Sequence, residues 1–424
     1  MIIGIDIRVL AKGARTGVED YTINLLSHLI PLDKSTKYRL FYNGFRKPNL
    51  KYPWLKLPNV KTKKFRIPNR IFDLILTIIK FPKIDKLLKG VDVFLSPHFL
   101  ITPLSRKTKR IMVFYDLSFL RFPEFFSRPK RLWHKFMRAK RQARNTDAIV
   151  AISESTRQDL IDFYGINPSK IKVIYPGIDG KFKIIEDGQK LLEVSRKYNL
   201  PVSPSGEPGK FILYFGTIEP RKNILGLIKA FENIKKEKSG KILEVDWRGF
   251  EGFVRGRKEK AFDYSQLKLV IAGTRGWLDN NVFETARKSE FKDDIIFTGF
   301  INEDDKPYLY NLAEIFVYPS FFEGFGLPPL EAMACGVPTI VSHKSSLPEV
   351  VGDAAIMIDP QNIDELAFTI KEVLENRELN GCLEKRGIER AKQFNWDNTA
   401  KQFLELFKTS TYAEASADKY ANRD

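Results

Sequence analysis

The sequence predicts a two-domain α/β protein in which each domain is a doubly wound parallel sheet covered by helices on both faces. Short apolar runs alternate with segments of helical periodicity along most of the chain. This alternation starts again after the turn-rich segment 175–179, where we place the domain boundary. The chain has 424 residues, which is more than one hydrophobic core usually contains.

The first domain is expected to span residues 1–178 and to open with a strand, a glycine-containing turn and a helix. Its strands are expected at 2–7, 38–42, 91–95, 110–114, 148–152 and 171–174. Its helices are expected at 18–29, 71–88, 128–145 and 155–163. Proline at position 82 should kink or split the second of these helices. The basic, proline-containing segment 45–70 is interpreted as a connection.

The second domain, residues 179–395, repeats the alternation of strands and helices. Its strands are expected at 211–215, 267–272, 295–298, 315–318, 339–341 and 355–358. Helices are expected at 224–234, 307–313, 328–335, 347–350, 363–376 and 379–393, with a final helix at 396–407. The charged segment 235–266 is longer than a strand connection needs, so we interpret it as a surface insertion. Residues 411–424 are expected to be a flexible tail.

The chain is strongly basic, with 70 Lys and Arg against 52 Asp and Glu and a formal net charge of +18. A basic surface attracts nucleic acid, an anionic membrane surface or an acidic substrate. Because no nucleic-acid-binding module is recognisable, we expect no nucleic-acid partner. An anionic membrane surface is kept as a hypothesis, and the alternative is a lysine-rich surface that is simply solvated.

The cysteines and the apolar runs indicate the compartment. Two cysteines, Cys335 and Cys382, cannot form a disulfide framework, which favours a reducing cytosol. The chain begins directly with an apolar strand and shows no signal peptide. The longest apolar run, 71–79, is too short to cross a bilayer and contains an acid. We expect a cytoplasmic protein, either soluble or peripheral on the inner face of the plasma membrane.

The stretch 313–341 has the pattern of a strand, a loop rich in Phe and Gly, a helix and a second strand. Pro328 and Pro329 favour a helix start, while Gly336 and Pro338 favour its end. The loop therefore lies at the carboxyl end of a parallel strand, the edge of an α/β sheet where ligands bind.

Two carboxylates frame this loop, Glu323 within it and Glu331 in the helix. The backbone N–H groups of Phe325, Gly326 and Leu327 lead into the helix start, a favourable place for a phosphate. Gly324 and Gly326 would let the backbone come close to a ligand. The alternative is structural: Glu331 would be a first-turn acid favoured by the helix dipole, and Glu323 a solvated loop residue.

Two cations, Arg221 and Lys222, close the loop after the strand at 211–215. At the carboxyl end of a strand they are placed to neutralise a diphosphate, Arg221 as a bidentate donor and Lys222 as a point charge. An Arg-Lys pair on its own is more often plain surface.

The motif that joins these features is a pair of glutamates separated by seven residues, within YPSFFEGFGLPPLEAMACGVPTIVS. It resembles the signature of the retaining glycosyltransferases of family four, which have the GT-B fold of two Rossmann-like domains facing a central cleft. The resemblance implies that the second domain binds a nucleotide diphosphate sugar, GDP- or UDP-linked, and that the first binds a glycan or lipid-linked acceptor. It also implies that the final helix, about 396–410, packs back on the first domain. The stretches LSFLRFPEFF and YPGID resemble bacterial mannosyltransferase-like enzymes of surface-polysaccharide synthesis.

The resemblance also implies roles for single residues. Glu323 would contact the hydroxyls of the donor sugar and Glu331 the ribose. The segment YFGTIEPRKNI resembles the phosphate-binding segment of the family, in which many relatives have an arginine after the glycine that matches Gly216. Here that position is Thr217, so Arg221 would supply the guanidinium. The residues expected to hold the base, largely through backbone groups, are Gly273, Gly299 and Phe300.

In the first domain, relatives typically have His-Asp where this chain has Tyr115-Asp116. The histidine of the relatives faces the transferred sugar, so either Tyr115 or His98 would take that role here. Gly17 resembles the family's loop that meets the diphosphate or the acceptor.

The leaving nucleoside diphosphate needs its developing charge stabilised. Because the sequence contains no Asp-x-Asp motif, we expect no metal and no other cofactor, with Arg221, Lys222 and the helix start in that role. Two other readings stay open at this point: a sugar-nucleotide epimerase on the same fold, and a basic peripheral binding protein whose transferase site is degenerate.

Overall fold

The computed structural model describes residues 1–11, 17–44, 50–202, 209–236 and 262–421. The chain forms two compact units. The first contains residues 1–121, 128–179 and 394–424, and the second contains residues 122–127 and 180–393. The middle of the expected insertion at 235–266 lies outside the described residues.

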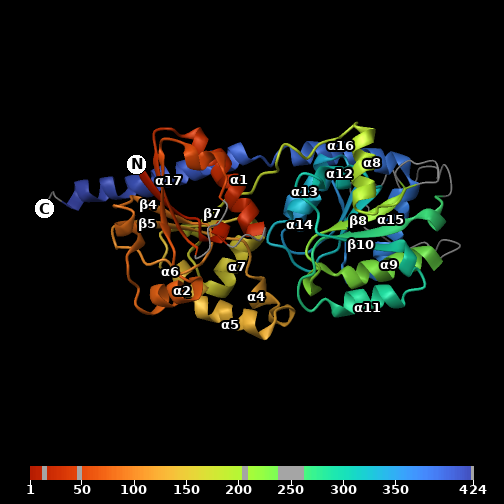
Figure 1. The fold of residues 1–424 in the computed structure, drawn as a ribbon, viewed down its shortest axis with the longest axis horizontal. Helices are drawn as coiled ribbons and strands as arrows, with labels where there is room; N and C mark the ends of the chain where they lie inside the picture. The colour runs from red at the N-terminus through yellow and green to blue at the C-terminus, as the bar shows by residue number, and fades with distance from the viewer. Residues whose placement is uncertain (12–16, 45–49, 203–208, 237–261, 422–424) are drawn as a thin grey trace. The chain divides into compact units, whose positions relative to one another are not determined.

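The first unit is built on a seven-stranded parallel sheet with the order β3-β2-β1-β4-β5-β6-β7. The strands are β1 (Ile2–Asp6), β2 (Lys37–Asn43), β3 (Val60–Phe65), β4 (Val93–Ser96), β5 (Lys109–Phe114), β6 (Ala148–Ala151) and β7 (Ile171–Val173). The helices are α1 (Gly17–Leu32), α2 (Asn69–Ile78), α3 (Ile84–Leu87), α4 (Ser118–Arg121), α5 (Arg128–Met137), α6 (Ala139–Arg144), α7 (Glu154–Tyr164) and α17 (Trp396–Ala421). In Figure 1, α1 and α17 lie on one side of this sheet, and α2, α6 and α7 on the other.

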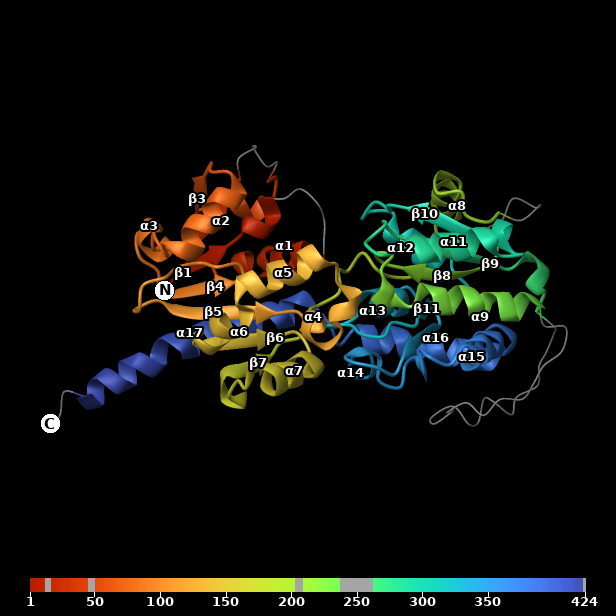
Figure 2. The same ribbon diagram turned by 90° about the horizontal axis from the view of Figure 1, so that it is seen from below.

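The second unit contains a six-stranded parallel sheet with the order β10-β9-β8-β11-β12-β13. The strands are β8 (Phe211–Phe215), β9 (Lys268–Ala272), β10 (Ile295–Gly299), β11 (Ile315–Tyr318), β12 (Thr339–Ser342) and β13 (Ile356–Ile358). The helices are α8 (Gly188–Lys197), α9 (Ile224–Lys236), α11 (Asn280–Lys288), α12 (Lys306–Asn311), α13 (Leu327–Ala334), α14 (Leu347–Val351), α15 (Ile363–Glu375) and α16 (Arg377–Ala391). Helices cover both faces of this sheet, as Figure 2 also shows. The two parallel sheets confirm the predicted fold class.

Both sheets are buried cores rather than half-exposed surfaces. The side chains of β4 and β11 are buried along their whole length. Strands of a parallel sheet covered on both faces have this continuous apolar character, which is why they were recognisable in the sequence. One apolar cluster of the first unit joins α2 to the sheet through Phe72 and Leu76, which pack with Phe41 and Phe94.

Two expectations of secondary structure were wrong. Residues 60–65 form the edge strand β3 within the segment expected to be a connection. Its three exposed residues, Lys61 to Lys63, hide the apolar signature, as is common at sheet edges. The helix expected at 128–145 is two helices, because Arg138 adopts a left-handed conformation with a φ of 50°. Helix α17 runs from Trp396 to Ala421.

The apolar segment at 71–88 is divided, as the proline predicted. Helix α2 ends at Ile78 and α3 begins at Ile84, with Lys80 in a left-handed conformation between them. Among the described residues, no helix combines the length and the apolar character needed to cross a bilayer.

Candidate functional site

The two loops singled out in the sequence meet at the carboxyl edge of the second sheet. Strands β8 and β11 are hydrogen-bonded neighbours and run parallel, so the segments that follow them emerge side by side. Arg221 and Lys222 follow β8 in a short 3-10 turn, Pro220–Lys222. Glu323 follows β11 in the loop that leads into α13.

The cations converge on the Glu323 carboxylate. Lys222 Nζ lies 2.5 Å from Glu323 Oε1, and Arg221 Nη1 lies 3.1 Å from Glu323 Oε2. Lys222 also donates to the hydroxyl of Tyr318, the last residue of β11, at 2.6 Å. We call Arg221, Lys222, Glu323 and Tyr318 the ion cluster. The first three of these residues are the ones that the sequence analysis singled out.

The ion cluster is nearly dry. Only 6% of Lys222 and 6% of Glu323 is exposed to solvent. Burial on its own would raise the pKa of Glu323, but the Lys222 and Arg221 cations lower that pKa below its ordinary value. Burial also lowers the pKa of Lys222, and the neighbouring Arg221 adds to this effect, while Glu323 opposes it. Each charge is therefore held in place by its opposite rather than by water.

The loop that carries Glu323 is fixed by the segment between β12 and α14. The Glu323 N–H donates to Ser345 Oγ at 2.8 Å. Ser346 Oγ donates to the carbonyl groups of Glu323 and Phe325, at 3.0 and 2.7 Å. Gly326 then starts α13 with a φ of 113°, a conformation that favours glycine. The carboxylate thus projects from a rigid turn.

Glu331, the second glutamate of the motif, has a different partner. It accepts a hydrogen bond from the Tyr310 hydroxyl of α12 at 2.8 Å. Its burial raises the pKa of the carboxyl group, although Lys306 opposes the shift. The two glutamates are therefore in opposite electrostatic environments. The environment of Glu323 favours the ionised carboxylate, and that of Glu331 favours the neutral carboxyl group.

Three glycines follow consecutive strands along the same edge: Gly216 after β8, Gly273 after β9 and Gly299 at the end of β10. All three have positive φ angles, of 153°, 136° and 69°. The Gly273 N–H donates to the Gly299 carbonyl at 3.0 Å. A methyl group at Gly273 would lie 2.0 Å from the Gly216 carbonyl oxygen, whereas at Gly299 nothing lies within 4 Å. Thr217 and Phe300, next to two of these glycines, are exposed, Phe300 by 58%.

In the first unit, the structure places Tyr115 and His98 after the neighbouring strands β5 and β4. The Tyr115 hydroxyl donates to the Pro97 carbonyl at 2.7 Å, and burial raises the pKa of Tyr115. His98 Nδ1 accepts from the Leu100 N–H at 3.0 Å, while its Nε2 lies 3.7 Å from Asp6 Oδ1. Asp116 Oδ1 accepts from the backbone and hydroxyl groups of Ser118.

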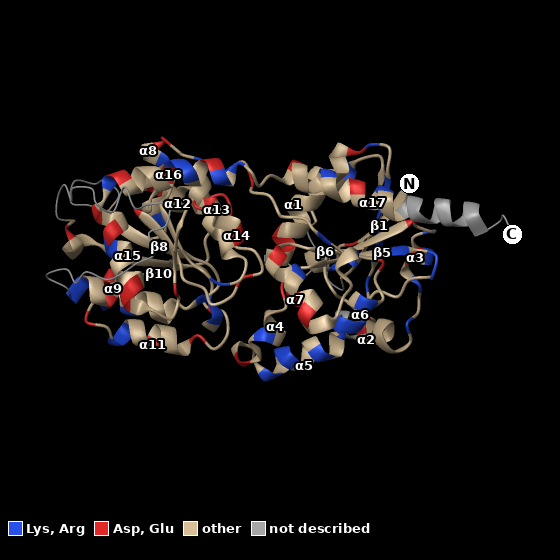
Figure 3. Cartoon of the chain, turned by 180° about the vertical axis from the view of Figure 1, so that it is seen from behind, with Lys and Arg blue, Asp and Glu red and all other residues tan. Residues whose placement is uncertain are grey.

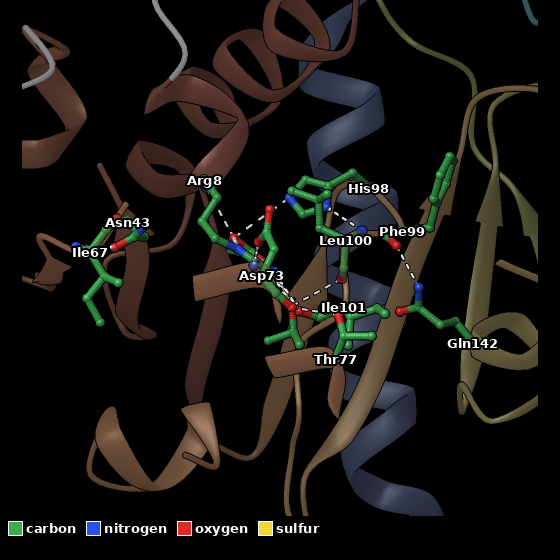
Figure 4. A network of polar contacts seen from close by, with 12 residues as sticks. Arg8, Asn43, Ile67, Asp73, Thr77, His98, Phe99, Leu100, Ile101 and Gln142 are labelled. Carbon is green, nitrogen blue, oxygen red and sulfur yellow. Dashed lines mark hydrogen bonds and ion pairs between the residues drawn. The ribbon is translucent and has the colours of Figure 1, made fainter. Parts of the chain in front are cut away.

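Figure 4 shows that His98 belongs to a polar network at the end of β1. Asp6 lies at its centre and pairs with Arg8 at 2.7 Å, and Arg8 also donates to Thr102 at 2.7 Å. Burial would raise the pKa of Asp6, but Arg8 and His98 lower it strongly. His98 and Tyr115 therefore have structural contacts of their own. Gly17 is the first residue of α1, and Arg15 and Thr16 before it lie outside the described residues.

Within the described ranges, no group of three or more His, Cys, Asp or Glu residues is arranged to hold a metal ion. Three contributors to the site were not anticipated from the sequence: Tyr318, Ser345 and Ser346. Their sequence signal is position alone: Tyr318 ends β11, and Ser345 and Ser346 lie between β12 and α14.

The family model "Glycosyl transferases group 1" matches residues 196–393, and "Glycosyltransferase Family 4" matches residues 15–182. O-antigen chain mannosyltransferase B of Escherichia coli is 30% identical over 317 residues, which cover 74% of each chain. The chain belongs to the group 1 glycosyltransferases.

Two further similarities bear on this glycosyltransferase. The serotype-specific mannosyltransferase WbdA of Escherichia coli is 30% identical over 305 residues, 70% of this chain, and the match spans only 33% of WbdA. The structure of Anabaena HepE in complex with UDP and glucose has a TM-score of 0.67 and 17% identity, covering 96% of this chain and 99% of that one. The glycosyltransferase thus has the GT-B fold and is related to mannosyltransferases of polysaccharide synthesis.

We predict that the ion cluster stabilises the fold only while Glu323 is ionised. Glu323→Gln leaves Lys222 buried with no anionic partner, which should lower the free energy of unfolding by about 3–5 kcal/mol at neutral pH. The pKa of Glu323 is lowered on folding, so its contribution is present above the unfolded pKa and disappears as pH falls through the folded pKa. Urea unfolding at several pH values should show the difference between wild type and variant shrinking in acid.

The matched control is Glu193→Gln, which removes an exposed ion pair with Lys190 and should cost less than about 1 kcal/mol. A penalty for Glu323→Gln that is equal to this control, or that does not change with pH, would contradict the prediction.

We predict that Gly273→Ala is far more destabilising than Gly299→Ala. Both substitutions place a side chain at a positive φ, at a cost of roughly 1–2 kcal/mol. Only the first also forces a methyl group against the Gly216 carbonyl, which should add about 1–3 kcal/mol. Thermal unfolding of the two variants measures the difference, and equal midpoints would show that the strand ends can move apart.

Proposed function

We propose that this glycosyltransferase transfers a hexose, mannose by preference, with retention from a GDP- or UDP-linked donor to a glycan or lipid-linked acceptor. The reaction would take place in the cytoplasm, on the inner face of the plasma membrane, in the synthesis of a polysaccharide or glycoconjugate. One observation carries the proposal: two cations and a carboxylate from adjacent β-α loops converge at the edge of the second sheet.

The cations would act on the leaving group. As the bond between the anomeric carbon and the phosphate oxygen breaks, negative charge grows on the diphosphate. Lys222 is buried, and both cations are held by ion pairs, so they would need little rearrangement to stabilise this charge. The acceptor hydroxyl would form the new bond from the same face of the sugar, and its proton would pass to the departing phosphate. No metal ion is required in this scheme.

The carboxylates would position the donor. Glu323 would accept hydrogen bonds from sugar hydroxyls, and Glu331 from the ribose, because a carboxylate can accept from two adjacent hydroxyl groups. The backbone of Gly216 and Thr217 would lie beside the diphosphate, with the loop residues Gly324 to Leu327 at the helix start of α13.

The base would lie along the edge formed by Gly273, Gly299 and Phe300, where the exposed Phe300 ring offers a surface for stacking. In the first unit, Gly17, Tyr115 and Asp116 remain the residues proposed to face the sugar and the acceptor. His98 is the alternative to Tyr115 in this role. The relatedness to polysaccharide mannosyltransferases and the UDP bound in the HepE structure support this assignment.

The proposal predicts that removal of either cation strongly lowers turnover in a protein that still folds. Lys222→Met and Arg221→Met should each lower kcat by on the order of a hundredfold or more, as expected for loss of a charge that stabilises the transition state. Release of nucleoside diphosphate from a panel of GDP-, UDP- and ADP-sugars is the measurement, with Lys190→Met as an exposed control. Circular dichroism verifies the fold of each variant.

A folded wild-type protein that neither turns over nor is thermally stabilised by any donor would favour the degenerate binding protein instead. Conversion of the donor sugar without transfer would favour the epimerase.

Metal independence is a separate prediction. Turnover with the preferred donor should be unchanged by EDTA, because Arg221 and Lys222 supply the positive charge that a metal ion would otherwise bring. A loss of turnover in EDTA that manganese restores would show that the cations are insufficient.

A further inference from the structure

The first unit carries an apolar surface that its own core does not use. Large apolar side chains are exposed on α2 and in the turn after it, and on α5. They are Ile71, Leu74, Ile78, Ile79, Phe81, Leu132, Trp133 and Phe136, half of the sixteen exposed large apolar side chains among the described residues. We call these eight residues the apolar face. Such a concentration on two helices requires an explanation beyond chance exposure.

Helix α2 has apolar residues on its outer side as well as on the side that faces the core. Its inward residues include Phe72 and Leu76, which fill the core, but also Asp73, which accepts from Arg8 Nη1 at 3.2 Å (Figure 4). Its outward residues are aliphatic: Ile71 is 52% exposed and Ile78 is 67% exposed. A helix that only covers a sheet places polar residues on this outer side.

Helix α5 also has an apolar outer side that the fold does not require. Met137 is buried, and the His134 ring stacks on Phe119 with 4.0 Å between the ring centroids. These two residues attach the helix to the unit. The Trp133 ring also lies near Phe99, with 5.8 Å between the ring centroids, and Trp133 is 42% exposed. Leu132, Trp133 and Phe136 share a different side of the helix, because residues three and four positions apart are neighbours on a helix surface.

Positive charge borders the apolar face. Residues 128–144 contain eight Lys and Arg and no Asp or Glu. Figure 3 shows this basic colouring on α5 and α6, and the three views place α2 near α5. Around the helix, Arg128, Arg131 and Lys135 lie next to the arc of Leu132 and Phe136. The turn after α2 adds Lys80.

We propose that the apolar face and its basic border form a docking surface for an anionic phospholipid bilayer. Aliphatic and aromatic side chains would enter the boundary between headgroups and acyl chains, with Trp133 at the depth that tryptophan prefers. The neighbouring Lys and Arg side chains would lie at the level of the phosphates. This surface is argued from its own residues and does not depend on the transfer reaction.

Charge and chemistry favour a bilayer over the other occupants of an apolar surface. Nucleic acid binding uses aromatic rings for stacking, whereas five of the eight residues here are Ile or Leu. A second copy of the chain would bring two strongly basic borders together, and like charges across an interface are unfavourable.

Flotation of the full-length protein with vesicles tests the proposal. Binding should be strong to vesicles of phosphatidylcholine with phosphatidylglycerol and weak to phosphatidylcholine alone, and it should fall as salt is raised. The triple variant L132S/W133S/F136S should bind roughly tenfold or more weakly. The charge variant R128Q/R131Q/K135Q should lose its preference for the anionic vesicles. The matched control I184S/L278S removes exposed apolar side chains of the second unit and should bind like wild type.

A second readout keeps the test informative if a triple variant misfolds. Brominated lipids should quench part of the tryptophan fluorescence, and W133F alone should abolish that part. Donor turnover in detergent-free solution reports the transfer site independently, and it should be the same in wild type and in both surface variants.

Equal binding to neutral and anionic vesicles, or equal loss in I184S/L278S, would overturn the proposal. So would a dimer in sedimentation that dissociates in L132S/W133S/F136S while vesicle binding is absent, because the apolar face would then be an interface between copies.

Discussion

The second unit depends on a buried ion cluster in which neither charge could exist alone. A lysine that is 94% enclosed would lose its proton or unfold the loop without an anion, and Glu323 supplies that anion from the adjacent strand. Arg221 is held in turn between Glu323 and the buried Glu219. Two glutamates thus face two cations in a space with little water. The two loops can therefore adopt this fold only if the buried charges are paired.

Under the proposed function, this balance has a consequence for donor binding. Glu323 pairs with Arg221 and Lys222, the two cations that the diphosphate would need. Donor binding would then exchange an internal anion for an external one, and the freed carboxylate would be available to the sugar hydroxyls. The two cations lose their water when the protein folds, so donor binding would not require this desolvation free energy a second time.

The sequence predicts well those strands whose residues are apolar along their whole length. Strands β8 and β11 were placed to the residue because both are apolar along their length and bounded by turn residues. Because β8 and β11 are adjacent parallel strands in the structure, the loops that follow them lie side by side. Edge strand β3 could not be found because its exposed lysines interrupt the apolar pattern. The break between α5 and α6 occurs at Arg138, which has a left-handed conformation. A glycine at this position would have indicated the break, but arginine does not.

The site itself was predictable in composition but not in pairing. Spacing within the motif could not tell which glutamate would meet the cations. Glu323 lies in the loop before α13 and pairs with Lys222, whereas Glu331 lies within the helix and accepts from Tyr310. Ser345 and Ser346 act from a loop more than twenty residues away in sequence, and only the folded chain brings them under Glu323. Contacts of this kind depend on side-chain direction and tertiary packing, which no local pattern records.

The path of the chain constrains how this enzyme can have evolved. Because the first unit is completed by residues 394–424, the bulk of the second unit is an insertion between two parts of the first. Exchange of the donor half between two genes therefore needs a pair of recombination points, near codons 179 and 393, rather than a single one. A hybrid made with one crossover would receive an α17 foreign to the α1 it must cover, so compatible partners at that helix pair would limit which chimaeras survive.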